Sequence, residues 1–87
     1  MAEFTSGGVT YVYTHQAETA KDVLDMLAPH LGKQATAYLD NGCGHIKATR
    51  ITLAAVGGRD VAFWFNGKRY VKNGLEFTHK PVHVHQG

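Results

Sequence analysis

Cysteine and proline are scarce in this chain, and long apolar runs are missing altogether. The single cysteine, Cys43, excludes an internal disulfide framework, so the fold requires no oxidising compartment. No apolar run approaches the roughly 20 residues that span a bilayer, and the N-terminus lacks the basic start and apolar stretch of a signal peptide. We therefore expect a soluble, cytoplasmic protein with no membrane partner.

Motifs for catalysis and phosphate binding are equally sparse. The glycine pairs at 7–8 and 57–58 lack the spacing of phosphate-binding loops and are interpreted as turns. In "NGCGH", Cys43 and His45 lie on the same side of an expected strand, but a cysteine nucleophile also needs a third group that orients its base. The sequence shows no such motif. We therefore predict that the protein is not an enzyme and needs no cofactor.

The 87 residues are expected to fold as a single α+β domain with a small core. A chain of this length buries only roughly 60–65% of the surface that its unfolded state exposes. Its charge is uneven: residues 1–41 carry two basic and five acidic side chains, whereas residues 42–87 carry seven basic and two acidic ones. This asymmetry predicts an acidic helical side and a basic sheet side, and the basic side favours an acidic or polyanionic partner.

The N-terminal half predicts a strand followed by one helix. Residues 1–8 are a small-residue leader that we expect to be flexible, and 9–14 alternate as a strand does. Thr14 is the expected N-cap of the helix and Gly32 its C-terminal cap. Pro29 predicts that the helix ends, or kinks, near Ala28. The apolar stripe at helical spacing consists of Ala20, Val23, Leu24, Leu27 and Leu31.

The stretch "QATAYLDNGCGHIKATRITLAAV" predicts two antiparallel strands. If Asn41-Gly42 is a two-residue turn, Tyr38 lies opposite His45. An uninterrupted second strand would place Arg50 on the apolar face and turn the following apolar residues away from it. We therefore expect a β-bulge within 49–51.

The C-terminal half predicts a three-stranded meander with two Asn-Gly turns, at 66–67 and 73–74. The first turn pairs Trp64 with Arg69. Pro81 makes residues 80–87 an edge strand or a tail. The expected fold is thus one amphipathic helix packed on an antiparallel sheet of about five to six strands. The core face of the meander is predicted to hold Val61, Phe63, Phe65, Tyr70, Leu75 and Phe77.

The opposite face of the meander is the candidate binding surface. Opposed Trp64 and Arg69 are placed to stack by a cation–π contact, and a Trp beside an Arg is typical of protein interfaces. The same face is a natural homodimer interface. The structural alternative is that a second layer or the N-terminal strand covers Trp64. The predicted partner-binding residues are Trp64, Lys68, Arg69, Lys72, Lys47 and Arg50.

Six histidines raise the question of a metal site. His83 and His85, two apart on a strand, project to the same side, as zinc ligands must, whereas His79 joins them only if the chain turns back at Pro81. No cysteine or carboxylate lies close enough in sequence to complete four ligands. We therefore predict no metal site and keep these three histidines as a secondary alternative.

The element order and the hairpin "FWFNGKRYVKNG" resemble small phage-encoded anti-CRISPR inhibitors, among them a type I-F family. The likeness is clearest over "WFNGKRYV", in which Lys68 and Arg69 are the matched positions. The histidine-rich end and the first strand depart from that family's pattern. The resemblance implies a non-enzymatic protein that binds a CRISPR effector complex near its nucleic-acid path, in the host cytoplasm.

Taken together, the residues and the resemblance predict a non-catalytic module that binds and occludes a protein or nucleoprotein partner. Direct nucleic-acid binding is the alternative, since a basic, aromatic sheet can stack bases. "RDVAFWF" is similar to the sheet motif of RNA-recognition domains, although Asp60 stands where that motif requires Gly. A small metal-binding protein or enzyme that uses the C-terminal histidines is the third possibility.

Overall fold

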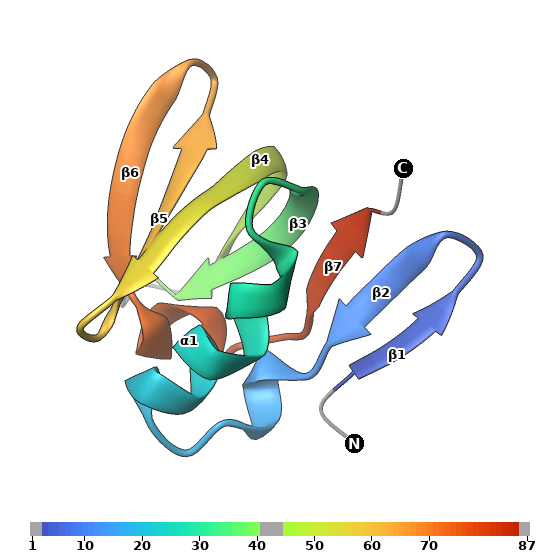
Figure 1. The fold of residues 1–87 in the computed structure, drawn as a ribbon, viewed down its shortest axis with the longest axis horizontal. Helices are drawn as coiled ribbons and strands as arrows, with labels where there is room; N and C mark the ends of the chain where they lie inside the picture. The colour runs from blue at the N-terminus through green and yellow to red at the C-terminus, as the bar shows by residue number, and fades with distance from the viewer. Residues whose placement is uncertain (1–2, 41–44, 86–87) are drawn as a thin grey trace.

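A seven-stranded antiparallel sheet and one short α-helix make up the described part of the chain, residues 3–40 and 45–85, in this computed structural model (Figure 1). The strands are β1 (Glu3–Ser6), β2 (Val9–Val12), β3 (Gln34–Asp40), β4 (His45–Gly57), β5 (Asp60–Phe65), β6 (Lys68–Asn73) and β7 (Val82–His85). The helices are α1 (Ala20–Leu27) and the 3₁₀ turns η1 (Thr14–Gln16), η2 (Ala28–His30) and η3 (Gly74–Phe77).

The strand order is β1-β2-β7-β3-β4-β5-β6, which confirms the α+β antiparallel class. The sheet has more strands than predicted because two terminal segments join it. β1 forms within the leader at 1–8 that was expected to be flexible. The expectation that 80–87 is an edge strand or tail was wrong, since β7 pairs with β2 on one side and β3 on the other. Pro81 precedes β7 and so leaves its ladder intact.

Helix α1 begins one residue after Thr19, which forms a capping box with Asp22. The Thr19 hydroxyl accepts from the Asp22 amide, and the Asp22 carboxylate accepts from the Thr19 amide. Thr14, the expected N-cap, lies in η1 instead. The predicted end near Ala28 is confirmed, because α1 ends at Leu27 and the 3₁₀ turn η2 begins at Ala28, with Pro29 as its second residue. The chain turns there, so Leu31 leaves the apolar stripe and is exposed.

The pairing of β3 with β4 confirms the bulge and corrects the register. Ala35 lies opposite Ile51 and Ala37 opposite Ala48, so β4 carries one extra residue between these pairs, and Arg50 adopts φ +58° there. Tyr38 lies opposite Lys47, two positions beyond the predicted register. A shift of two leaves Tyr38 and Lys47 on the face that the sequence predicted for both. The predicted turn at 41–42 lies outside the described residues.

The β5–β6 hairpin has the predicted register, with Trp64 opposite Arg69, and a turn in which Asn66 and Gly67 both have positive φ. The predicted third strand of the meander is wrong. Asn73 instead caps the 3₁₀ turn η3, and Gly74 has no positive φ. A Cβ at Gly74 would lie 2.7 Å from the carbonyl oxygen of Ala20. Glycine is therefore required at 74 for the close packing of η3 on α1, and not for a hairpin.

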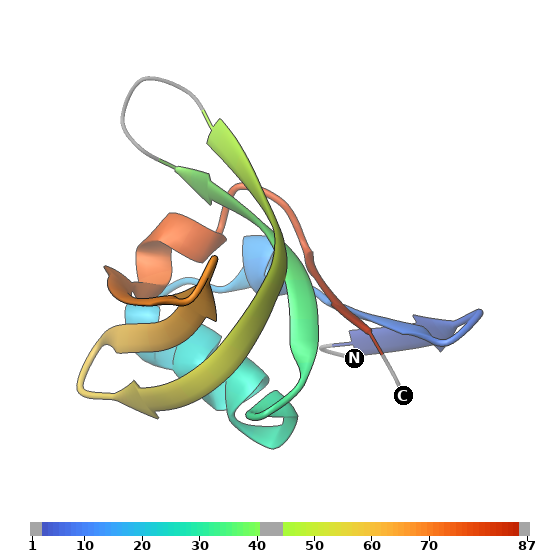
Figure 2. The same cartoon turned by 90° about the horizontal axis from the view of Figure 1, so that it is seen from above.

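The core lies between the curved sheet and the helices, which gather on one side of it (Figure 2). Val61, Phe63 and Phe77 are buried there as predicted, and Phe65 packs partly against them. Two predicted core residues are exposed: Tyr70 because β6 is an edge strand, and Leu75 because η3 replaces the third strand. The other fully buried side chains include Val12, Val23, Leu27, Ile51, Leu53, Val82 and Val84.

Candidate binding face of the sheet

The face of the sheet opposite α1, here named the outer face, holds the candidate site (Figure 2). Its members follow from the pairing registers and from the burial of their neighbours along each strand. For example, Val61 and Phe63 are in the core, so Ala62 and Trp64 point outward. The outer face carries Tyr11, Thr36, Tyr38, Lys47, Thr52, Ala62, Trp64, Arg69, Val71 and His83.

Trp64 is exposed on this face, with 46% of its surface accessible. Val71, two residues beyond Arg69 on β6, is 51% exposed. Thr52 lies opposite Trp64 on the other neighbouring strand. Within the described residues, neither a second layer nor the N-terminal strand covers the indole. We name Trp64, Arg69 and Val71 the Trp64 patch.

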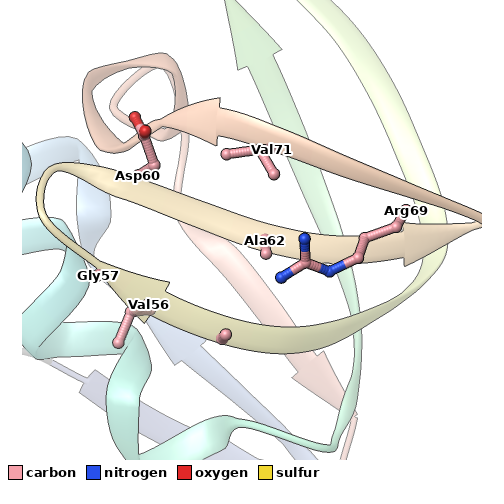
Figure 3. Close-up of a pocket in the computed structure, with 7 residues that line it drawn as sticks. Val56, Gly57, Asp60, Ala62, Arg69 and Val71 are labelled. Atoms are coloured by element: carbon pink, nitrogen blue, oxygen red, sulfur yellow. The ribbon is translucent and has the colours of Figure 1, made fainter.

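A shallow hollow of about 260 Å³ adjoins the Trp64 patch. Small residues form its floor, since Ala55 on β4 lies opposite Ala62 on β5. The Arg69 side chain extends across Ala62, with Asp60 at the far end of the hollow (Figure 3). The residues that line it are Ala55, Val56, Gly57, Asp60, Ala62, Arg69 and Val71.

The predicted basic residues do not form one patch. Lys68 lies opposite Phe65 and Lys72 opposite Val61, so these two lysines point to the α1 side of the edge strand β6. Only Arg69 shares the face and the neighbourhood of Trp64.

The two basic residues on β4 lie apart from Trp64 along the sheet. Lys47 is on the outer face near the start of β4, opposite Tyr38, whereas Trp64 pairs with Thr52. Five residues of strand separate Lys47 from Thr52, which is roughly 15 Å at the usual rise of a β-strand. Arg50 is exposed at the bulge between them.

A second group of outward side chains was not found from the sequence. The rings of Tyr11 on β2 and Tyr38 on β3 flank His83 on β7, with centroids 4.7 Å and 6.1 Å from the imidazole. The amino group of Lys80 lies 5.0 Å from the centroid of Tyr38. The alternation in "VTYVY" and "VHVH" indicates which side these rings take. It does not indicate that β7 lies between β2 and β3, and that placement brings the rings together.

Two of the three C-terminal histidines make contacts within the fold. His83 packs against the two tyrosines, and the Nε2 atom of His85 lies 3.2 Å from the Thr36 hydroxyl. His79 is exposed in the turn before β7. Within residues 3–40 and 45–85, no three His, Cys, Asp or Glu side chains are grouped to hold a metal ion. Cys43 lies outside the described residues.

Burial lowers the pKa of His83 below its ordinary value of 6.5, and repulsion from His85 and Lys47 lowers it further. Both neighbours that act electrostatically on His83 are basic. Two basic side chains, His85 and Lys47, therefore lie near His83.

Comparisons of the chain with protein-family models, with curated proteins and with solved structures give no match. Among the described residues, no helix has the length and apolar character needed to cross a membrane.

Proposed function

We propose that this protein is a non-catalytic binding module that docks on a macromolecular partner through its outer face, with the Trp64 patch at the centre of the contact. The observation that carries the proposal is the 46% exposure of Trp64 opposite Arg69. Tryptophan and arginine are the residue types most enriched where interface energy concentrates. The adjoining hollow gives a side chain of the partner a place to insert.

The partner that fits this face best is a nucleoprotein complex, which the protein would bind and occlude. Seven of the nine basic side chains belong to residues 42–87, and Arg69, Arg50 and Lys47 lie on β4 and β6 of the sheet. The resemblance to anti-CRISPR inhibitors supports the same kind of partner, with Arg69 as the matched residue on the outer face. Its other matched residue, Lys68, points to the α1 side of β6 and would contact the partner only at the sheet edge.

Comparative capture from the native host tests this proposal. Tagged wild-type protein is used beside Trp64→Ala and Leu75→Ala, because Leu75 is 51% exposed but lies in η3, on the helical side. We expect the captured partner to be retained by Leu75→Ala and lost from Trp64→Ala, with both variants folded by circular dichroism. A Trp64→Ala variant that is folded and captures the partner at the wild-type level would refute the proposal.

A second copy of the chain is the other occupant that this face fits. Trp64 and Val71 would then pack against their counterparts across a two-fold axis. Sedimentation velocity separates the two cases. A monomer at micromolar concentration supports a foreign partner, whereas a dimer that Trp64→Ala dissociates assigns the face to self-association.

A further inference from the structure

Three rings form a row across neighbouring strands of the outer face, separate from the Trp64 patch. They belong to Tyr11 on β2, His83 on β7 and Tyr38 on β3, and we name them the ring row. The imidazole packs against both tyrosines in edge-to-face geometry. All three side chains are half-buried, so part of each stays accessible from the outer face.

Basic groups border the ring row. Lys80 places its amino group 5.0 Å from the centroid of the Tyr38 ring, and Lys47 lies opposite Tyr38 on β4. His85 follows His83 on the same side of β7. The two neighbours that influence the charge of His83 are Lys47 and His85, and both oppose a further positive charge there. The ring row is therefore suited to an anionic ligand.

The ring row is held in place before any ligand arrives. β7 and β3 are interior strands, paired on both sides, and β2 is paired with β1 and β7. The hydrogen bond between Thr36 and His85 joins the side chains of two of these strands. A site carried on such strands loses little conformational entropy on binding, which favours affinity.

We propose that the ring row is a binding site for single-stranded nucleic acid, in which bases stack on Tyr11 and Tyr38 and phosphates contact Lys47 and Lys80. Every base has a π face that stacks on an aromatic side chain, and a single strand offers these faces while its backbone follows basic groups. An acidic peptide would satisfy the lysines and leave the rings without a partner. A duplex would keep its base faces hidden.

This inference goes beyond the proposed function and does not depend on the Trp64 patch. The rings lie on β2, β7 and β3, whereas the Trp64 patch lies on β5 and β6. Variants of the two tyrosines therefore change the ring row and leave the Trp64 patch unaltered, while Lys47 lies on β4, the strand between the two groups. If both are present, a nucleoprotein partner is contacted on its protein and on its nucleic acid at once.

Fluorescence anisotropy with labelled oligo(dT) and oligo(rU) tests the inference. Strands of about 12 nucleotides fall within the range that single sheet domains occupy. We expect Tyr38→Ala to weaken binding roughly 5- to 150-fold, the loss of one stacked base, and Tyr38→Phe to bind as the wild type does. Tyr38→Leu keeps apolar volume in place of the ring and should lose binding as Tyr38→Ala does, and circular dichroism of each variant separates a loss of binding from a loss of fold.

Charge variants and a duplex control complete the experiment. Lys47→Gln with Lys80→Gln should reduce the salt dependence of binding by about 1.4 in log–log slope, because each phosphate contact contributes about 0.7 on a single strand. Lys21→Gln, on the exposed side of α1, should leave the slope unchanged. Preference for dT or for rU identifies the natural strand. Binding of neither, or binding of the duplex as tightly as the single strand, would overturn the inference.

Discussion

Trp64 and Arg69 occupy opposed positions on β5 and β6, yet their side chains do not stack on each other. The Arg69 side chain extends across Ala62 instead (Figure 3), and among the described residues the cation–π contact joins Lys80 and Tyr38. The indole is therefore left accessible on the outer face, where Val71 is also exposed. The 46% exposure of the indole is the observation that supports Trp64 as the centre of the proposed contact.

Trp64→Ala should lower the free energy of unfolding by less than about 1 kcal/mol, because the side chain is half exposed and packs against no second layer. Phe63→Ala, one residue earlier on the same strand, should cost about 3–5 kcal/mol, since that ring is buried in the core. Urea unfolding of the two variants measures the difference. Equal losses would mean that Trp64 is structural.

Gly74→Ala should destabilise the protein by about 1–3 kcal/mol, because the new Cβ would lie 2.7 Å from the Ala20 carbonyl oxygen and would force η3 away from α1. Gly57→Ala is the matched control: it also lacks a positive φ, and a Cβ there meets nothing within 4 Å. Thermal unfolding compares the two. A Gly74→Ala variant as stable as Gly57→Ala would contradict the close packing of η3 on α1.

Thr14→Val should cost about 1–3 kcal/mol although it preserves the shape of the side chain. The buried Thr14 hydroxyl is placed to donate to the carbonyl oxygens of Phe77, at 2.7 Å, and of Lys80, at 3.2 Å. These bonds fasten η1 to the segment that leads into β7, and valine would leave a buried carbonyl without its donor. Thr14→Ser retains the hydroxyl and should recover most of the loss in the same unfolding measurement. Equal stability of the Val and Ser variants would rule out this role for the hydroxyl.

His83 should make the protein less stable as the pH falls. Burial, then His85 and then Lys47, lower its pKa in the folded state below the ordinary 6.5 of the unfolded chain. Between the folded pKa of His83 and 6.5, the unfolded chain binds more protons than the folded chain. The stabilisation is therefore complete above pH 6.5 and is lost as the pH falls through the folded pKa. His83→Gln removes this contribution. Its free energy of unfolding should therefore fall less steeply than that of the wild type between about pH 7.5 and 5, and parallel curves would contradict the assignment.

The features that were predicted correctly from the sequence are those that depend on residues close together in the chain. The turn at Asn66-Gly67 fixes the register that opposes Trp64 to Arg69, and both were predicted correctly. The bulge that contains Arg50 was predicted because an uninterrupted strand would place Arg50 on the apolar face and turn the following apolar residues away from it. These features depend on neighbouring residues alone, so a single sequence contains the information needed to predict them.

Prediction failed where distant segments decide the structure. "NG" at 73–74 looks like the turn at 66–67, but Gly74 is selected by its contact with Ala20, more than fifty residues earlier. The position of β7 between β2 and β3 is equally non-local, and it creates the ring row. The grouping of Lys68 and Lys72 with Trp64 has a different cause, because it was based on their closeness in sequence alone. The hairpin register, which was predicted correctly, pairs them with Phe65 and Val61 and so assigns them to the other face.

The most direct test of the central claim is the fluorine NMR signal of Trp64 in the bound state. Trp64 is the one tryptophan of the chain, so 5-fluorotryptophan labelling gives a single signal that an unlabelled partner does not obscure. The account predicts that the purified partner shifts and broadens this signal and removes its sensitivity to a soluble paramagnetic probe. A complex in which the signal keeps its free position and its full sensitivity to the probe would contradict the account.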